Sequence, residues 1–164
     1  MNDGIFEKIH ENVCEAFKKA FPSFTIYDEH PRGKHREISL PCIFNELVSL
    51  DDLIQDAIGT SYVTATWETR LLIATKGAKK RQAWTLSAKL FKEIHGKVFG
   101  IADIGEAKVT SCIDDGADPN AEGYEVWRLE WTQQVPLIDS DLALLGDGFI
   151  PVKMDINGNV GAYG

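Results

Sequence analysis

The chain has 164 residues, 44% of them hydrophobic and 26% charged, which are proportions typical of one folded domain. Its formal net charge of −8 disfavours a protein that wraps nucleic acid, because that task requires a positive surface to displace counterions from phosphates. No run reaches the roughly 20 apolar residues that cross a bilayer, and the first residues lack the pattern of a secretion signal, so we expect a cytosolic protein.

The first two elements are predicted to be a helix and a short strand. Residues 3–20 carry apolar side chains at helical spacing, which predicts an amphipathic helix with Asp3 as its N-cap. Pro22 ends this helix, because proline cannot continue it. A short strand rich in aromatic and β-branched residues is expected from Phe24.

The stretch 38–59 is predicted to form a strand and then a short helix. The apolar residues at 38, 40, 42 and 44 alternate toward one face. Pro41 marks this strand as an edge or bulged one, because proline cannot donate to a ladder. The segment at 49–59 fits a short helix that begins at Ser49 and ends at Gly59.

Residues 61–75 form the strongest strand pattern of the chain, with apolar side chains from Val63 to Ile73 on one face. Glu68 and Arg70 lie on the other face, which meets either solvent or a partner as a polar seam between subunits. A strand of this length reaches roughly 45 Å, whereas a compact chain of this size is about 40 Å across. We therefore expect the strand to overhang the core.

A second long helix is predicted at 78–99, and two further strands at 106–113 and 124–137. The predicted fold is α+β, a mainly antiparallel sheet of four to five strands with two long helices packed on one face. Six large side chains on the apolar faces are expected in its core. They are Phe17, Trp67, Phe91, Trp127, Leu129 and Trp131.

The last segment of the chain has no sustained period of 2 or 3.6 residues. We therefore divide the chain into a domain at 1–137 and an extended C-terminal arm at 138–164. The arm keeps apolar residues that something must cover, among them Phe149, Ile150 and Tyr163. The polar segments at 114–123 and 146–164 are expected to order only against neighbours.

No catalytic, cofactor or metal site is predicted. The four histidines show no HxH or HxxxH pairing, and Cys14, Cys42 and Cys112 share no CxxC spacing, so we interpret the thiols as buried and unreactive. The carboxylate pairs at 51–52 and 114–115 sit where a cap and a turn favour aspartate. The common phosphate-loop, dinucleotide and nucleophile-elbow motifs are absent from the sequence.

Two basic clusters are candidate interfaces, and each is either a solvated face or a docking patch for an acidic neighbour. The first precedes the second strand, and its members are Arg32, Lys34, His35 and Arg36. The second lies where the second helix begins, although cations there oppose the helix dipole. Its members are Lys76, Lys79, Lys80 and Arg81.

Taken together, the opening helix, the strand ending in TWETRLLIATKG, the helix WTLSAKLFKEIHG and the strand YEVWRLEWTQQVPL resemble tail terminator proteins of long-tailed bacteriophages. The resemblance covers residues 3–137 and rests on the order of elements. It implies a non-enzymatic virion protein, assembled in the host cytoplasm, that closes into a hexameric ring and stops growth of the tail tube.

The same resemblance implies contacts with the tail tube protein, with head-side connector or neck proteins and, in a contractile tail, with the sheath. DNA would pass through the central hole without specific binding, and no membrane is involved. Two other classes of protein stay open. A small-molecule enzyme would need a pocket with convergent polar groups, and an adaptor module would stay monomeric or dimeric.

Overall fold

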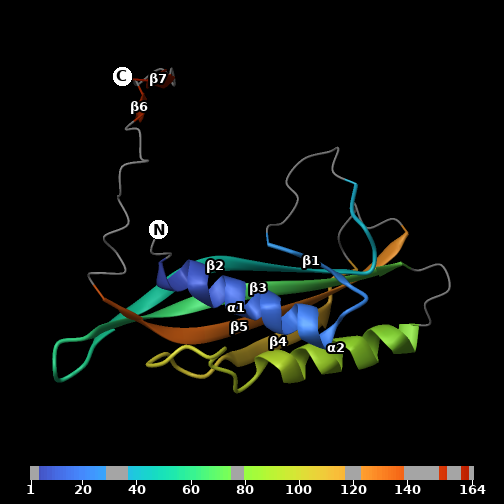
Figure 1. The fold of residues 1–164 in the computed structure, drawn as a ribbon, viewed down its shortest axis with the longest axis horizontal. Coiled ribbons are helices and arrows are strands. Elements are labelled where there is room, and N and C mark those ends of the chain that lie inside the picture. The colour runs from blue at the N-terminus through green and yellow to red at the C-terminus, as the bar shows by residue number, and fades with distance from the viewer. Residues whose placement is uncertain are drawn as a thin grey trace.

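A computed structural model describes residues 4–28, 37–74, 80–116, 123–138, 152–154 and 160–162. Its main body is a five-stranded sheet in the order β1-β2-β3-β5-β4, accompanied by two helices (Figure 1). The elements of this body are α1 (Ile5–Ala20), β1 (Thr25–Tyr27), β2 (Cys42–Gln55), β3 (Ser61–Ala74), α2 (Lys80–Ile94), β4 (Lys108–Asp114) and β5 (Tyr124–Leu137).

The α+β class and the mainly antiparallel sheet are confirmed. The pairs β2–β3, β3–β5 and β4–β5 are antiparallel, and β3 pairs with β5 along the whole length of both strands. Strand β1 runs parallel to β2, so the sheet is mixed. The predicted strand at 124–137 matches β5 at both ends.

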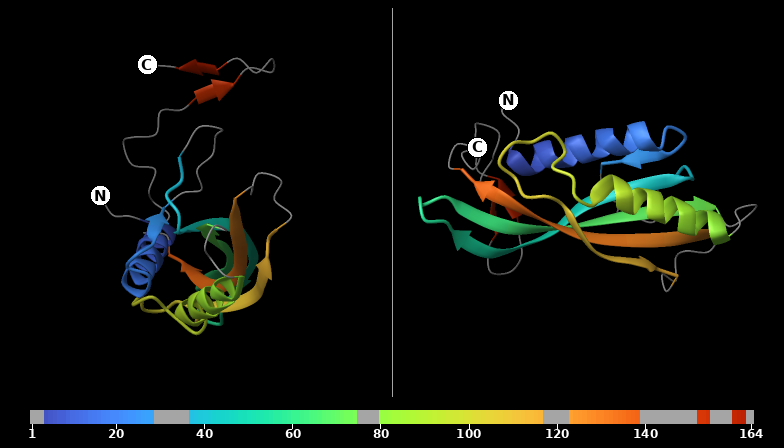
Figure 2. Two further views of the ribbon diagram at one scale, coloured as in Figure 1. Left: turned by 90° about the vertical axis from the view of Figure 1, so that its right-hand side faces the viewer. Right: turned by 90° about the horizontal axis from the view of Figure 1, so that it is seen from below.

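Both long helices cover the same face of the sheet (Figure 2), as the sequence predicts. Helix α1 buries Ile9, Val13 and Phe17, and α2 contributes Leu90 and Ile94 to the same core. The residue at the N-cap of α1 is Gly4, which makes no side-chain cap hydrogen bond. The expectation that Asp3 caps this helix is therefore wrong, because the helix begins at Ile5, one residue later than a cap at Asp3 requires.

The centre of the core is a pair of indole rings on neighbouring strands. Trp67 of β3 lies directly opposite Trp131 of β5, and the rings stack with their centroids 5.4 Å apart. Four of the six predicted core residues are buried: Phe17, Trp67, Leu129 and Trp131. Phe91 and Trp127 are only partly buried and pack against the margin of this core.

The predicted helix at 49–59 is wrong, because this segment is the second half of β2 and the turn into β3. Leu50 pairs with Ala65, and Ile54 pairs with Tyr62. Two register shifts in β2, between Leu47/Ser49 and Asp51/Ile54, interrupt the alternation of period two. Bulges of this kind insert extra residues into a strand, so the apolar residues fall at spacings of three and four that imitate a helix.

The predicted strand at 38–44 begins later than expected, since β2 starts at Cys42, immediately after Pro41. The alternating residues do share a face, but it is the sheet face opposite the helices. There Cys42 and Phe44 pack with Leu72 and Val126 in a second, smaller cluster. This cluster covers one end of the outer face, and charged side chains of β3 and β5, including Arg70 and Arg128, lie beside it.

Two short strands near the C-terminus, β6 (Val152–Met154) and β7 (Val160–Ala162), pair with each other in a separate antiparallel sheet. The other predictions for the arm, including contacts through Phe149, Ile150 and Tyr163, fall outside the described residues. Most of the polar segment at 114–123 also falls outside them.

Candidate interaction surface

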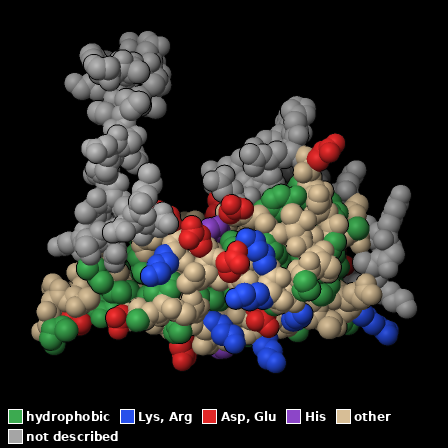
Figure 3. All heavy atoms as spheres, in the orientation of Figure 1, with side chains coloured by type: hydrophobic (Ala, Val, Ile, Leu, Met, Phe, Trp, Pro, Cys, Tyr) green, Lys and Arg blue, Asp and Glu red, His purple; other side chains and the backbone are tan. Residues whose placement is uncertain are grey.

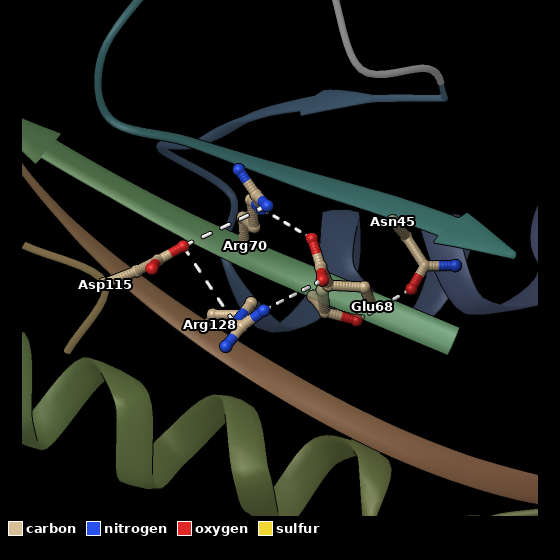
Figure 4. A network of polar contacts seen from close by, with 6 residues as sticks. Asn45, Glu68, Arg70, Asp115 and Arg128 are labelled. Carbon is tan, nitrogen blue, oxygen red and sulfur yellow. Dashed lines mark hydrogen bonds and ion pairs between the residues drawn. The ribbon is translucent and has the colours of Figure 1, made fainter. Parts of the chain in front are cut away.

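The outer face of the sheet carries a closed network of four charges (Figure 4). The Arg70 Nε donates to Glu68 Oε1 at 2.6 Å, and Arg128 Nη1 lies 3.6 Å from Glu68 Oε2. Asp115 Oδ2 lies 4.0 Å from a nitrogen of each arginine. Because two cations and two carboxylates face one another, the network is neutral and fixes the end of β4 against β3 and β5.

The network explains how two arginines tolerate direct opposition. Arg70 pairs with Arg128 across β3 and β5, and like charges in that position destabilise a sheet unless they are compensated. Glu68 and Asp115 compensate them. The sequence pattern correctly placed Glu68 and Arg70 on the outer face, but it missed Asp115 as their partner because that residue follows a strand end that tertiary packing brings across the sheet.

Beneath this face, a chain of hydrogen bonds links the sheet to helix α1. The Trp131 indole N–H donates to Thr69 Oγ1 at 2.9 Å, and the Thr69 hydroxyl donates to Asn45 Oδ1 at 2.7 Å. The Asn45 amide nitrogen then lies 3.2 Å from His10 Nδ1, and His10 Nε2 lies 3.7 Å from the Cys14 sulfur. Asn45, Thr69 and Trp131 are all buried.

The direction of this chain fixes the role of the histidine. An indole N–H is only a donor, so Thr69 must accept from Trp131 and donate to Asn45, which turns the Asn45 amide N–H toward His10 Nδ1. A neutral His10 then carries its proton on Nε2, facing Cys14, and cannot remove the thiol proton. Burial, assisted by the negative charge of Asp28, also raises the pKa of Cys14 to about 11. The arrangement therefore favours a structural thiol over a nucleophile.

The most exposed apolar surface of the described residues lies at the connection between β2 and β3. We call this surface the hairpin tip. Its side chains are between 48% and 88% exposed, and they account for four of the nine large apolar side chains that are exposed in the described part of the chain. They are Leu50, Leu53, Ile54 and Ile58.

The shape of the hairpin tip is set by its turn. The Asp56 carboxylate accepts backbone N–H groups from Ile58 and Thr60, and Gly59 adopts a φ of +91°, which few other residues tolerate. The tip extends past the N-terminal end of α1 (Figure 1), which agrees with the overhang expected from strand length. Sequence reasoning found the overhang but assigned its apolar residues to a helix.

The remaining predicted interface residues are distributed as follows. Arg81 is exposed on the first turn of α2, and the backbone of Lys80 belongs to the same turn. The other basic residues of both clusters lie outside the described residues, namely Arg32, Lys34, His35, Arg36, Lys76 and Lys79. The structure therefore brings Glu68 and Arg70 together and leaves Arg81 on a different surface.

Within the described residues, no group of three or more His, Cys, Asp and Glu side chains is arranged to hold a metal ion. None of the helices in the same residues is both long and apolar enough to cross a membrane. The amino-acid sequence matches no protein-family model and shows no significant similarity to a curated protein.

Proposed function

We propose that this chain is a non-catalytic structural subunit that assembles with copies of itself, and that the assembly is the ring that ends a phage tail tube. The observation that carries the proposal is the hairpin tip, where four large apolar side chains are exposed, Leu50 on the inner face of the ribbon and Ile54 on the outer face. Large apolar side chains gathered at one end of a folded domain favour a protein contact, because leaving them in water forfeits the free energy of burial.

The order of elements supports the more specific part of this proposal. The chain resembles tail terminator proteins in this order, which is a helix, a pair of strands, a second helix and a closing strand. In a ring of six copies, the excess of 25 acidic over 17 basic residues would give the central hole a wall that repels DNA and lets it pass. The same ring would present one side to the tail tube and the other to the head connector.

The test is the morphology of tails assembled with and without this protein, seen by electron microscopy. Without it, we expect tubes of irregular length that fail to join heads, and we expect both defects to disappear when purified protein is added. Tails of normal length that join heads in its absence would overturn the tail-terminator function.

A second measurement tests self-assembly independently of the phage. The molar mass of the purified chain is followed by light scattering from dilute to concentrated solution, alone and in the presence of tail tubes. A mass that rises above that of one chain in either condition supports a self-assembling subunit. A chain that stays monomeric in both conditions would favour the adaptor class.

A further inference from the structure

The hairpin tip has a complementary surface at the other end of the molecule. Strand β3 runs 14 residues from the hairpin tip to its far end, which spans roughly 45 Å, and α2 begins only six residues beyond that end. The hairpin tip and the start of α2 therefore lie at opposite ends of the sheet (Figure 1). Two such surfaces on one chain cannot cover each other.

The hairpin end is acidic as well as apolar. From residue 49 to residue 60 the chain contains three acidic residues and no Lys, Arg or His. Asp51 and Asp52 are exposed among the apolar side chains of the tip. A partner for this surface must supply both apolar area and positive charge.

The outward face of α2 supplies both. Arg81, Trp84, Ala88 and Lys92 are exposed at helical spacing, and we call these residues the α2 stripe. Trp84 is 53% exposed, which is unusual for a large aromatic side chain on a helix, and it stands one turn from the small Ala88. Exposed tryptophan and arginine are the residues most often found at the energetic centre of protein interfaces.

The charges of the two ends are opposite. Helix α2 carries four basic residues and one acidic residue, and its first turn contains no acid. The space-filling view shows Lys and Arg side chains along the edge formed by α2, and hydrophobic side chains at the end formed by the hairpin (Figure 3). Cations at the start of a helix oppose its dipole, so a nearby acidic partner would relieve an unfavourable local field.

We infer that the hairpin tip of one copy docks on the α2 stripe of the next copy, with Leu53 and Ile58 against Trp84 and Ala88. Asp51 and Asp52 then face the cations of the stripe. This inference rests on the proposed self-assembly and specifies its contact. Because the two surfaces differ, the contact is head-to-tail, so it does not stop at a dimer, and it forms a ring when the rotation between successive copies closes.

The decisive experiment mixes two variants that are each blocked at one end. The hairpin-blocked variant carries Leu53→Asp and Ile58→Asp, and the helix-blocked variant carries Arg81→Glu and Trp84→Glu. Each variant alone should stay monomeric under conditions in which the wild-type chain assembles. Mixed together, they should form a 1:1 dimer and nothing larger, because each contributes its one intact surface. Native mass spectrometry reads the result directly.

Several outcomes overturn the inference. A helix-blocked variant that dimerises by itself shows that hairpin tips bind each other, and variants that both assemble like the wild type place the contact elsewhere. Both outcomes leave self-assembly standing. A wild-type chain that never assembles, alone or on tail tubes, overturns the docking and the proposed function together. Far-UV circular dichroism and melting temperature confirm that each variant is folded.

Charge exchange gives a second test that does not depend on apolar residues. Asp51→Lys or Arg81→Glu alone should weaken association, and the two in one chain should restore it, since the opposed charges are then exchanged.

Trp84→Ala should weaken association by about tenfold or more, the effect of losing a central interface residue. Association that is insensitive to all three changes would exclude the α2 stripe.

Discussion

Two apolar regions of the same ribbon of strands end in opposite environments. Around Trp67 the inner face of β3 is covered by both helices, whereas at the hairpin tip the apolar side chains face solvent. The reason is length. Helix α1 has 16 residues and spans about 24 Å, but β3 with 14 residues spans roughly 45 Å. Helices of this length cannot cover the whole ribbon, so one end of it stays exposed.

The comparison predicts that substitutions in the covered region cost folding free energy, whereas those at the hairpin tip cost association. Trp131→Ala should give the largest loss, about 3–5 kcal/mol of the free energy of unfolding, because it removes a buried ring and leaves a cavity. Urea unfolding measures it. Trp84→Ala, at an exposed position, is the control and should change stability by less than about 0.5 kcal/mol. Equal losses in the two variants would show that Trp131 is not central to the core.

The buried thiols predict that the stability of the fold depends on pH. Burial raises the pKa of Cys14 to about 11 and that of Cys42 to about 12, from an unfolded value of 9.0. Above pH 9 the unfolded chain therefore releases protons that the folded chain keeps, and the folded state loses stability as the pH rises toward 12.

For Cys14 alone the loss amounts to about 2–3 kcal/mol once the pH passes 11. The free energy of unfolding, measured from pH 8 to pH 12, should fall more steeply with pH for the wild type than for a Cys14→Ala, Cys42→Ala double variant. Below pH 9 both thiols are protonated in the folded and the unfolded chain, so the two proteins should show the same pH dependence there. Identical slopes above pH 9 would show that the thiols are accessible to water.

The hydrogen-bonded chain under the sheet predicts a smaller loss. Thr69→Val keeps the shape of the side chain but leaves the Trp131 indole N–H and Asn45 Oδ1 without their partner, which should cost about 1–3 kcal/mol. Thr66→Val on the outer face of the same strand is the matched control, expected within about 0.5 kcal/mol of the wild type. If the two threonine variants melted at the same temperature, the chain of hydrogen bonds would contribute nothing to stability.

The hairpin tip predicts the smallest change in stability and the largest change in assembly. Ile58→Ser should leave the free energy of unfolding of the monomer within about 0.5 kcal/mol of the wild type, because the side chain is almost fully exposed. The same substitution at buried Ile43 of this hairpin should cost several times more. Denaturation measures the first quantity and light scattering the second. An Ile58→Ser chain that assembles normally would argue against the tip as a contact surface.

Much of the fold was predictable because the two strongest strands and the two long helices carry local periodicity. The buried residues alternate from Val63 to Leu71 in β3 and from Leu129 to Val135 in β5, so the inner faces of both strands could be assigned from the residues alone. Arg81, a member of the second predicted basic cluster, is exposed as expected. These properties depend on nearest neighbours in the chain, and sequence records them directly.

Other features were decided by contacts between distant residues. The bulges of β2 made a strand look like a helix, and only pairing with β3 settled its conformation. The contacts of Asp115 with Arg70 and Arg128 join residues far apart in the chain, and so does the contact of His10 with Asn45. These contacts could be identified only from the folded structure. The sequence by itself determined which residues are apolar or charged. The tertiary structure decided which of them the two helices can reach, because coverage depends on the relative lengths and positions of elements far apart in the chain.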